Sequence, residues 1–186
     1  IASITKVFTG LLGAKAVNEA KMNVNDPVTK YHSNQDLPHH FEKITIKDLL
    51  THRSGLPLLL PDISERLVNP EWETLAPYYN SLRENYSTEE FFKDLKNLPL
   101  STAEKKYSYS NIGANLMGYC LSGIYNQSYN DLLRKKIFIP LGMSNTYIQQ
   151  DEIKPTVGWR EGRKIANRSS SHMNADGGIV SCVADM

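Results

Sequence analysis

The residues with the clearest capacity for chemistry are Ser3 and Lys6, three positions apart at the start of an apolar segment. If residues Ile1 to Ala20 form a helix, the hydroxyl and the amine lie on one face. Burial in apolar surroundings disfavours the ammonium form, so the pKa of Lys6 is expected to fall until the amine can act as a base. A serine becomes a nucleophile when such a base takes its proton, so the pair predicts acyl transfer.

The same two residues also fit a structural interpretation. Ser3 would then cap the N-terminus of the helix, and Lys6 would extend along the surface to water. Serine and lysine are common, so about one S-x-x-K is expected by chance in a chain of this length. The chain contains one. If the chain is a helical structural domain in which this pair is incidental, Tyr109 and Asn111 would lie far from Ser3.

The element that positions this pair is the helix itself. Five apolar residues follow the serine: Ile4, Val7, Phe8, Leu11 and Leu12. They cover more of the cylinder than an amphipathic surface helix would, so a largely buried helix is expected. Gly10 and Gly13 lie about one turn apart and would allow another segment to approach closely.

A second polar motif, the Y-x-N of Tyr109 and Asn111, ends a polar loop that begins at Lys105. An apolar helix is expected directly after it, from about Ile112 to Tyr125. Side chains in such a loop can project into a cleft while the helix anchors them. Residues 78–80 match the same pattern within an irregular segment, so the context favours Tyr109 and Asn111.

Other elements follow from capping and turn residues. Helices are expected after Thr45, from Ser87 to about Asn97, and from Tyr129 to Phe138. Residues 57–86 contain four prolines and are expected to form a long, irregular insertion that borders a cleft or covers the core. The last six residues are expected to form the opening turn of a helix.

Composition excludes several classes of partner. The 186 residues suffice for one domain with a substantial core, and the net charge of +1 argues against nucleic acid or an anionic membrane. Cys120 and Cys182 lack the spacing of a metal site or disulfide framework, and His39 and His40 form no ligand pattern. No cofactor, metal or membrane-spanning segment is expected, and the oligomeric state is left open.

Five segments together resemble the serine β-lactamases of class C and their d-alanyl-d-alanine peptidase and esterase relatives. In chain order they are Ser3–Thr9, Asp48–Pro57 ("LLTHxSGLP"), Tyr109–Asn111, Pro140–Thr146 ("PLGMxxT") and Gly177–Met186 ("GGxxSxxxDM"). They occur in the order of the family and cover nearly the whole chain. The set is therefore far more specific than any one segment.

The resemblance implies an α+β fold of the β-lactamase/transpeptidase-like type. Residues 1–186 would be mainly the helical portion of a single catalytic domain, incomplete at both ends and lacking most of the antiparallel sheet. The third motif of the family, a K-T-G or H-x-G on a sheet strand that also supplies an oxyanion donor, is absent. The glycine that commonly precedes Y-x-N is replaced in residues 102–106.

The resemblance also implies roles for four residues. Ser3 would attack the substrate carbonyl and Lys6 would take its proton. Tyr109 would relay a proton to the leaving group or act as a base in deacylation, and Asn111 would bind Lys6 and a substrate amide. The backbone N–H of Ser3 would form half of an oxyanion hole. His52 is expected to bond the backbone, and Asp185 to be structural.

The expected function is that of a serine hydrolase acting through an acyl-enzyme on a small-molecule substrate: a β-lactam, a d-alanyl peptide or a small ester. The chain alone is expected to be inactive because the third motif is missing. For the same reason, the alternative is a non-hydrolysing β-lactam sensor or degenerate scaffold. Members of the family are often exported to the periplasm or cell surface, and the sequence leaves the compartment open.

Overall fold

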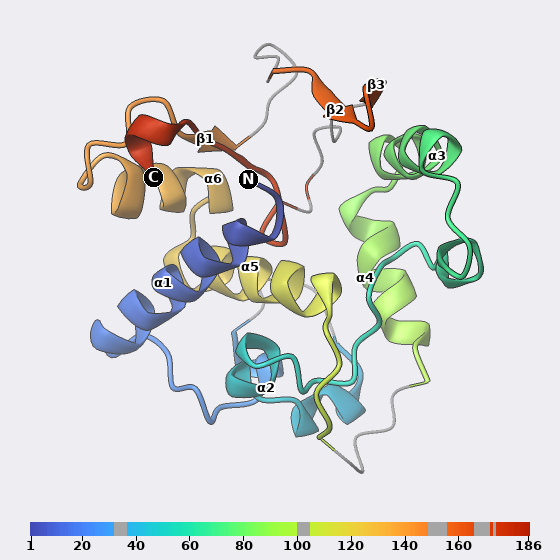
Figure 1. The fold of residues 1–186 in the computed structure, drawn as a ribbon. Coiled ribbons are helices and arrows are strands. Elements are labelled where there is room, and N and C mark those ends of the chain that lie inside the picture. The colour runs from blue at the N-terminus through green and yellow to red at the C-terminus, as the bar shows by residue number, and fades with distance from the viewer. Residues whose placement is uncertain (32–36, 100–104, 149–155, 166–171, 173) are drawn as a thin grey trace.

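The computed structural model describes residues 1–31, 37–99, 105–148, 156–165, 172 and 174–186, and helices dominate them (Figure 1). The α-helices are α1 Thr5–Asn18, α2 Ile46–Leu50, α3 Trp72–Glu84, α4 Thr88–Asn97, α5 Asn111–Tyr125 and α6 Tyr129–Leu133. Short 3-10 turns are η1 Ala2–Ile4, η2 Val28–Lys30, η3 His39–Lys43, η4 Ser64–Leu67 and η6 Val183–Asp185, and Arg134–Phe138 is a π-helical turn.

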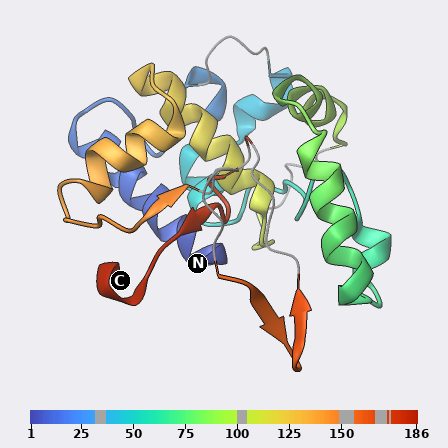
Figure 2. The same cartoon turned by 90° about the horizontal axis from the view of Figure 1, so that it is seen from above.

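Strands are few and short in the described residues. β1 (Tyr147–Ile148) pairs antiparallel with β4 (Ile179–Val180), with Tyr147 opposite Val180. β2 (Gly158–Arg160) pairs antiparallel with β3 (Arg163–Ile165), and this hairpin projects from the helical body (Figure 2). The second pair was not expected from the sequence, which shows only short polar segments there.

Capping residues explain where three helices begin. Thr45 and Ser87 form capping boxes with Asp48 and Glu90, each side chain bonding the backbone of the other residue. Ser110 caps α5 because its Oγ accepts the N–H of Gly113. The predictions of helices after Thr45, over 88–97 and up to Tyr125 are confirmed.

The prediction of an irregular insertion over residues 57–86 is wrong for its second half. α3 runs from Trp72 to Glu84 and contains Pro77. Its inward face buries Leu75 and Arg83, which are 6% and 2% exposed. Packing of one helical face stabilises a helix more than intrinsic propensity does, so one proline did not end it. Residues 102–104, part of the segment that replaces the glycine before Y-x-N, lie outside the described residues.

α5 is the central helix of the core, and α1 packs along it (Figures 1 and 2). Leu116, Met117 and Cys120 of α5 are fully buried or nearly so. A Cβ added to Gly13 of α1 would lie 3.0 Å from the Met117 Cε, so this glycine permits a close approach. Gly10 has nothing within 4 Å of such an atom, and the expectation for it is wrong.

The first helix is buried on one face only, which corrects the prediction of a largely buried helix. Phe8, Leu12 and Ala16 face the core, whereas Val7 is 68% exposed. Ile4 and Leu11 are also about half exposed, at 49% and 46%. The apolar residues of a helix show how much surface it could bury. They do not show which neighbouring elements are present to cover that surface.

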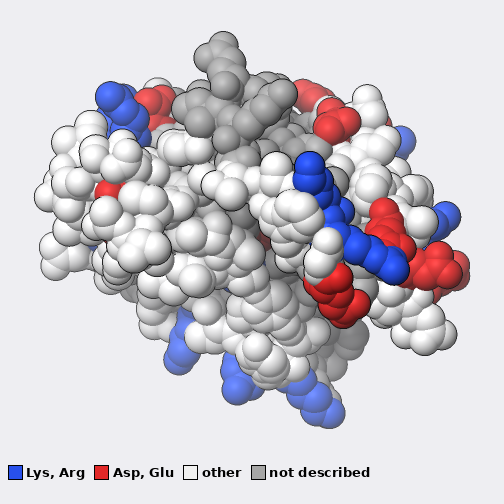
Figure 3. Space-filling model, turned by 45° about the horizontal axis from the view of Figure 1, so that its top comes forward, with Lys and Arg blue, Asp and Glu red and all other residues white. Residues whose placement is uncertain are grey.

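Charged side chains of both signs are visible on one face of the molecule (Figure 3). On the face shown in Figure 3, basic and acidic side chains lie near the edges and next to one another. Among the described residues, none of the helices combines the length and the apolar character needed to cross a bilayer. In that same part of the chain, no group of three His, Cys, Asp or Glu side chains is placed to hold a metal ion.

Candidate active site

Ser3 lies in the 3-10 turn that leads into α1, and Lys6 occupies the first turn of α1. The Lys6 Nζ is 3.3 Å from the Ser3 Oγ and donates a hydrogen bond to it. Ser3 is exposed and Lys6 is half-buried. Ser3 is not the capping residue of α1, because Ile4 occupies that position and no side chain caps the helix. The structural interpretation of Ser3 is therefore wrong on this point.

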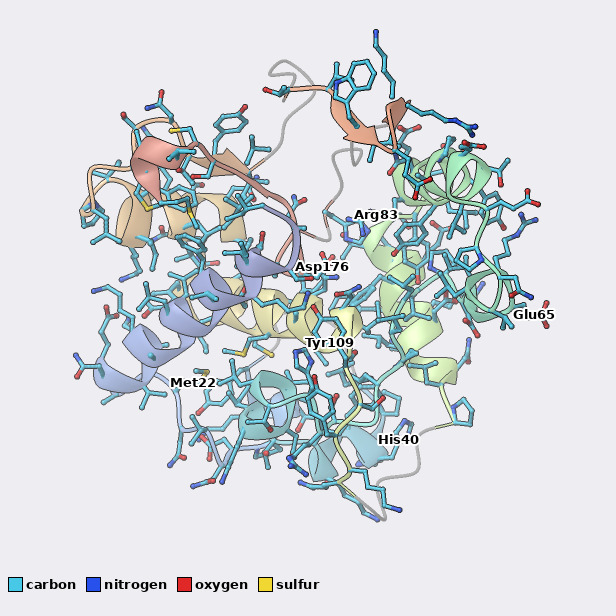
Figure 4. All side chains as sticks on the ribbon, viewed as in Figure 1. Met22, His40, Glu65, Arg83, Tyr109 and Asp176 are labelled. Atoms are coloured by element: carbon cyan, nitrogen blue, oxygen red, sulfur yellow. The ribbon has the colours of Figure 1, made fainter. Side chains whose placement is uncertain are left out.

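The Y-x-N motif folds back onto this pair, although it follows more than a hundred positions later. The Tyr109 hydroxyl donates to the Ser3 Oγ at 2.8 Å. The Asn111 Oδ1 accepts from the Lys6 Nζ at 2.8 Å, and the Nζ is 4.8 Å from the centroid of the Tyr109 ring. All four residues singled out in the sequence meet in one cluster, and Figure 4 labels one of them, Tyr109. The expectation that Y-x-N would lie far from an incidental serine is wrong.

A fifth group, the backbone carbonyl of Asp176, completes the surroundings of the lysine. It accepts from the Lys6 Nζ at 2.7 Å. This carbonyl belongs to a tight turn in which the Gly178 N–H bonds the Asn174 carbonyl at 2.9 Å. Sequence reasoning missed this contact because every residue has a main-chain carbonyl, which leaves no signal in residue types. The paired glycines at 177 and 178 were the only sign of a turn.

Two threonines of α1 fasten the helix to that turn and to the strand after it. Thr9 Oγ1 donates to the Ala175 carbonyl at 2.7 Å, and Thr5 Oγ1 accepts from the Ile179 N–H at 3.2 Å. Both threonines are buried. Lys6 therefore sits on a helix, and Ser3 on the 3-10 turn leading into it, whose position relative to the Asp176 carbonyl is held by hydrogen bonds on two successive turns of α1.

The loop that carries Tyr109 is held by the turn after α2. The Ser108 N–H bonds the His52 carbonyl at 2.8 Å, and the Asn111 N–H bonds the Leu58 carbonyl at 3.1 Å. Ser110 Oγ donates to the Pro57 carbonyl at 2.7 Å while it caps α5. The two polar segments 52–58 and 105–111 are thus a single hydrogen-bonded unit, which aims Tyr109 and Asn111 at α1.

His52 supports the phenol of Tyr109 and bonds the backbone, as expected from the sequence. Its ring centroid is 4.4 Å from that of Tyr109, and its Nδ1 accepts the Ser110 N–H at 3.2 Å. Burial, and next the charge of Lys6, lower the pKa of His52. A lowered pKa keeps the imidazole neutral near pH 7, so Nδ1 remains an acceptor and the proton resides on Nε2.

The arrangement is suited to moving protons at one oxygen. Ser3 Oγ lies within hydrogen-bonding distance of an amine and a phenol, the two groups that can remove or return a proton there. It also lies at the N-terminal end of α1, where the helix dipole favours negative charge. Asp185, by contrast, accepts from the Asn145 N–H and from Thr146 Oγ1, which is the structural role expected for it.

Known proteins resemble this chain in both sequence and structure. The Beta-lactamase family model matches residues 1–186. Protein flp of Staphylococcus aureus is 32% identical over 157 residues, which are 83% of this chain and 28% of that protein.

Two solved structures resemble the whole chain. A beta-lactamase/D-alanine carboxypeptidase from Yersinia pestis complexed with citrate matches with a TM-score of 0.71, 28% identity, and coverage of 100% of this chain and 50% of that one. An octameric penicillin-binding protein homologue from Pyrococcus abyssi matches with a TM-score of 0.70 and 30% identity, covering 100% and 42%. The chain therefore spans half or less of the length of these relatives.

Proposed function

The chain belongs to the beta-lactamase family, and we propose that it provides the nucleophile, the base and the proton relay of a serine hydrolase that forms an acyl-enzyme. The resemblance drawn from the sequence and the predicted β-lactamase/transpeptidase-like fold, present mainly as its helical part, are both confirmed. Because the chain spans only part of its relatives, the activity is proposed for the full-length protein, with residues 1–186 inside a single catalytic domain.

The observation that carries the proposal is the contact of Ser3 Oγ with both Lys6 and Tyr109. Lys6 takes the hydroxyl proton as the Ser3 Oγ forms a bond to the substrate carbonyl carbon. The bond to the leaving nitrogen or oxygen then breaks, Tyr109 delivers a proton to that atom, and the proton that Lys6 took from Ser3 passes to Tyr109 and restores the phenol. Water hydrolyses the ester on Ser3 and restores the free hydroxyl.

Two further groups support this chemistry. The Ser3 N–H, at the dipole-positive end of α1, is proposed to donate to the oxyanion that develops on the carbonyl. Asn111 holds the Lys6 Nζ with its Oδ1, which leaves its NH₂ group to bind a substrate amide. Candidate substrates are β-lactams, d-alanyl peptides and small esters. The similar Yersinia pestis protein, a beta-lactamase/D-alanine carboxypeptidase, supports the first two classes.

The test is covalent labelling of the full-length protein with a fluorescent penicillin. We expect labelling of the natural protein and its loss in Ser3→Ala. Ser108→Ala is the matched control, because this exposed serine lies in the Tyr109 loop and engages His52 through its backbone. Labelling that persists in Ser3→Ala would refute the assignment of the nucleophile.

Turnover distinguishes a hydrolase from a sensor. A hydrolase releases product from nitrocefin or a p-nitrophenyl ester through many cycles, whereas a protein that binds without turnover stops after one acylation. We expect sustained turnover, because Tyr109 and Lys6 remain next to Ser3 Oγ for the second step. A single burst equal to the protein concentration, with no steady state, would favour the sensor.

A further inference from the structure

A cavity of about 320 Å³ lies between α5, the start of α6 and the segment that leads into the turn at 174–178. Its wall includes residues from all three parts: Asn115, Tyr119, Ser122, Tyr129, His172 and Ala175. The proposed catalytic residues Ser3, Lys6 and Tyr109 do not line it. The cavity is therefore separate from the candidate active site, although the two share a turn.

Asn115 places an unpaired amide in this wall. The residue is 3% exposed, and its Oδ1 is buried with no hydrogen-bond partner among the described residues. A buried amide that has lost its hydration without gaining a partner destabilises the folded protein. Buried polar groups are nearly always paired, so this one indicates a partner that the described part of the chain does not supply.

The hydroxyl of Tyr129 can accept a further hydrogen bond but has no proton left to donate. Thr9 Oγ1 gives its single proton to the Ala175 carbonyl at 2.7 Å. The 2.7 Å contact between Thr9 Oγ1 and the Tyr129 hydroxyl is therefore donated by the tyrosine. Burial raises the pKa of Tyr129, so the phenol keeps its proton. A ligand that reaches this oxygen must be a donor.

His172, which also lines the cavity, is neutral. Burial lowers its pKa, and both of its ring nitrogens have partners. Nε2 donates to the Tyr86 carbonyl at 2.6 Å, which leaves Nδ1 to accept from the Tyr119 hydroxyl. The described side chains of the wall therefore carry no formal charge.

Charged side chains lie outside the wall and are of both signs. After the larger effect of burial, Arg83 lowers the pKa of His172 further and Glu89 raises it. Asp176 adds to the effect of burial on Tyr129. None of these three charged residues lines the cavity. An ion that entered would lose its hydration without meeting a partner of opposite charge in the wall.

We propose that this cavity is a binding site for a small, uncharged molecule that both donates and accepts hydrogen bonds, such as a primary amide. The ligand donates to Asn115 Oδ1 and accepts from the NH₂ group, and a half-turn of the Asn115 amide exchanges the two. Its hydrocarbon part packs on the rings of Tyr119 and Tyr129. The proposal goes beyond acyl transfer and does not depend on it.

Four probes that share one size and shape test this chemistry: benzamide, acetophenone, benzoate and benzamidine. Only benzamide is uncharged and carries both a donor and an acceptor. Their binding to the full-length protein is measured by ligand-observed NMR titration. We expect benzamide to bind with a Kd of about 1 mM or lower, and each of the others to bind about tenfold more weakly.

A substitution of Asn115 tests its role. Asn115→Leu nearly keeps the volume and removes the amide, so we expect the affinity for benzamide to fall about tenfold. Without ligand, the denaturant midpoint of this variant should rise, because an unpaired polar group has been removed. Asn97→Leu, at an exposed position of α4, is the matched control and should leave the affinity unchanged. A lower midpoint for Asn115→Leu would show that the amide has a partner within the protein and would overturn the proposal.

A second substitution localises the ligand. Ser122→Leu places a larger side chain in the cavity and should abolish benzamide binding, whereas Ser81→Leu, exposed on α3, should not. Unchanged binding in Ser122→Leu would overturn the proposal, and so would equal affinity for benzamide and any other probe. Absence of saturable benzamide binding would mean that the cavity holds only water. Ser3→Ala should bind benzamide like the natural protein, so this proposal and the hydrolase proposal fail separately.

Discussion

Tyr109 is the residue through which the second motif reaches the nucleophile. Its hydroxyl donates a hydrogen bond to Ser3 Oγ, while its ring packs on His52. Tyr109→Phe keeps the ring and removes the proton donor, so we expect kcat/KM for a p-nitrophenyl ester to fall about a hundredfold or more. Tyr107→Phe, in the same loop and 63% exposed, is the control and should change little. Equal rates for both variants would show that the phenol takes no part.

The neutral imidazole of His52 makes stability depend on pH. Its pKa lies below the ordinary 6.5 in the folded protein, so the unfolded chain takes up the proton first as pH falls. The free energy of unfolding should therefore be greatest above about pH 6.5 and should decline on acidification, as protonation removes the Nδ1 acceptor of the Ser110 N–H.

Urea unfolding at several pH values measures this dependence. His52→Gln should make the decline between pH 6.5 and 5 less steep, without abolishing it, because burial also lowers the pKa of His172. His39→Gln is the matched control, since the side chain of His39 is exposed. A decline of equal steepness in His52→Gln and in the natural protein would contradict the assignment.

At the level of residues, side-chain chemistry was predictable and main-chain chemistry was not. The types and spacing of Ser3 and Lys6, and those of Tyr109 and Asn111, pointed to the cluster that the structure brings together. The Asp176 carbonyl had no such signal, because its role depends on where a turn lies. The stacking of His52 on Tyr109 likewise depends on two loops meeting in space.

α5 holds the turn that contains Asp176, through a contact at Gly118. A Cβ added to Gly118 would lie 2.6 Å from the Ala175 Cβ, closer than two such atoms approach. We expect Gly118→Ala to lose about 1–3 kcal/mol of stability by overpacking, against about 0.5–1 kcal/mol gained in helix propensity. Displacement of the turn should also slow acylation, because the Lys6 Nζ loses one of its three acceptors, the Asp176 carbonyl.

A glycine in open space provides the comparison for that substitution. Gly10, inside α1, has nothing within 4 Å of an added Cβ. Gly10→Ala should therefore stabilise the protein by about 0.5–1 kcal/mol. Denaturant midpoints measure both changes. Stabilisation by Gly118→Ala would mean that the turn moves away at no cost, which would refute the close contact.

Elements with capping residues were predictable from the sequence, and those defined by tertiary packing were not. Ser87 and Glu90 mark the start of α4 through local hydrogen bonds, which the sequence spells out. α3 was missed because Pro77 signals a break, whereas the buried face around Leu75 depends on distant neighbours. The exposed side of α1 was missed for the same reason, since apolar residues do not reveal whether anything covers them.

In the molecule as a whole, the candidate site depends on the assembled core. Its groups come from α1, from the loop before α5 and from the turn at 174–178, segments joined by packing along α5. We expect penicillin labelling and near-ultraviolet circular dichroism to be lost at the same urea concentration, because the cluster has no local source of stability. Labelling that disappears well before the dichroism would indicate a site that loosens independently.

The hydrogen bond between Lys6 and the Asp176 carbonyl determines which substitutions can reveal it. Replacing a side chain at position 176 leaves that oxygen in place, so a mutational scan could pass over it. Substitutions at Gly118 and Gly178 would report on it instead, since an added methyl group at either position collides with the turn. The hydrogen bond from Lys6 to the Asp176 carbonyl therefore depends on two glycines, which carry no functional groups of their own.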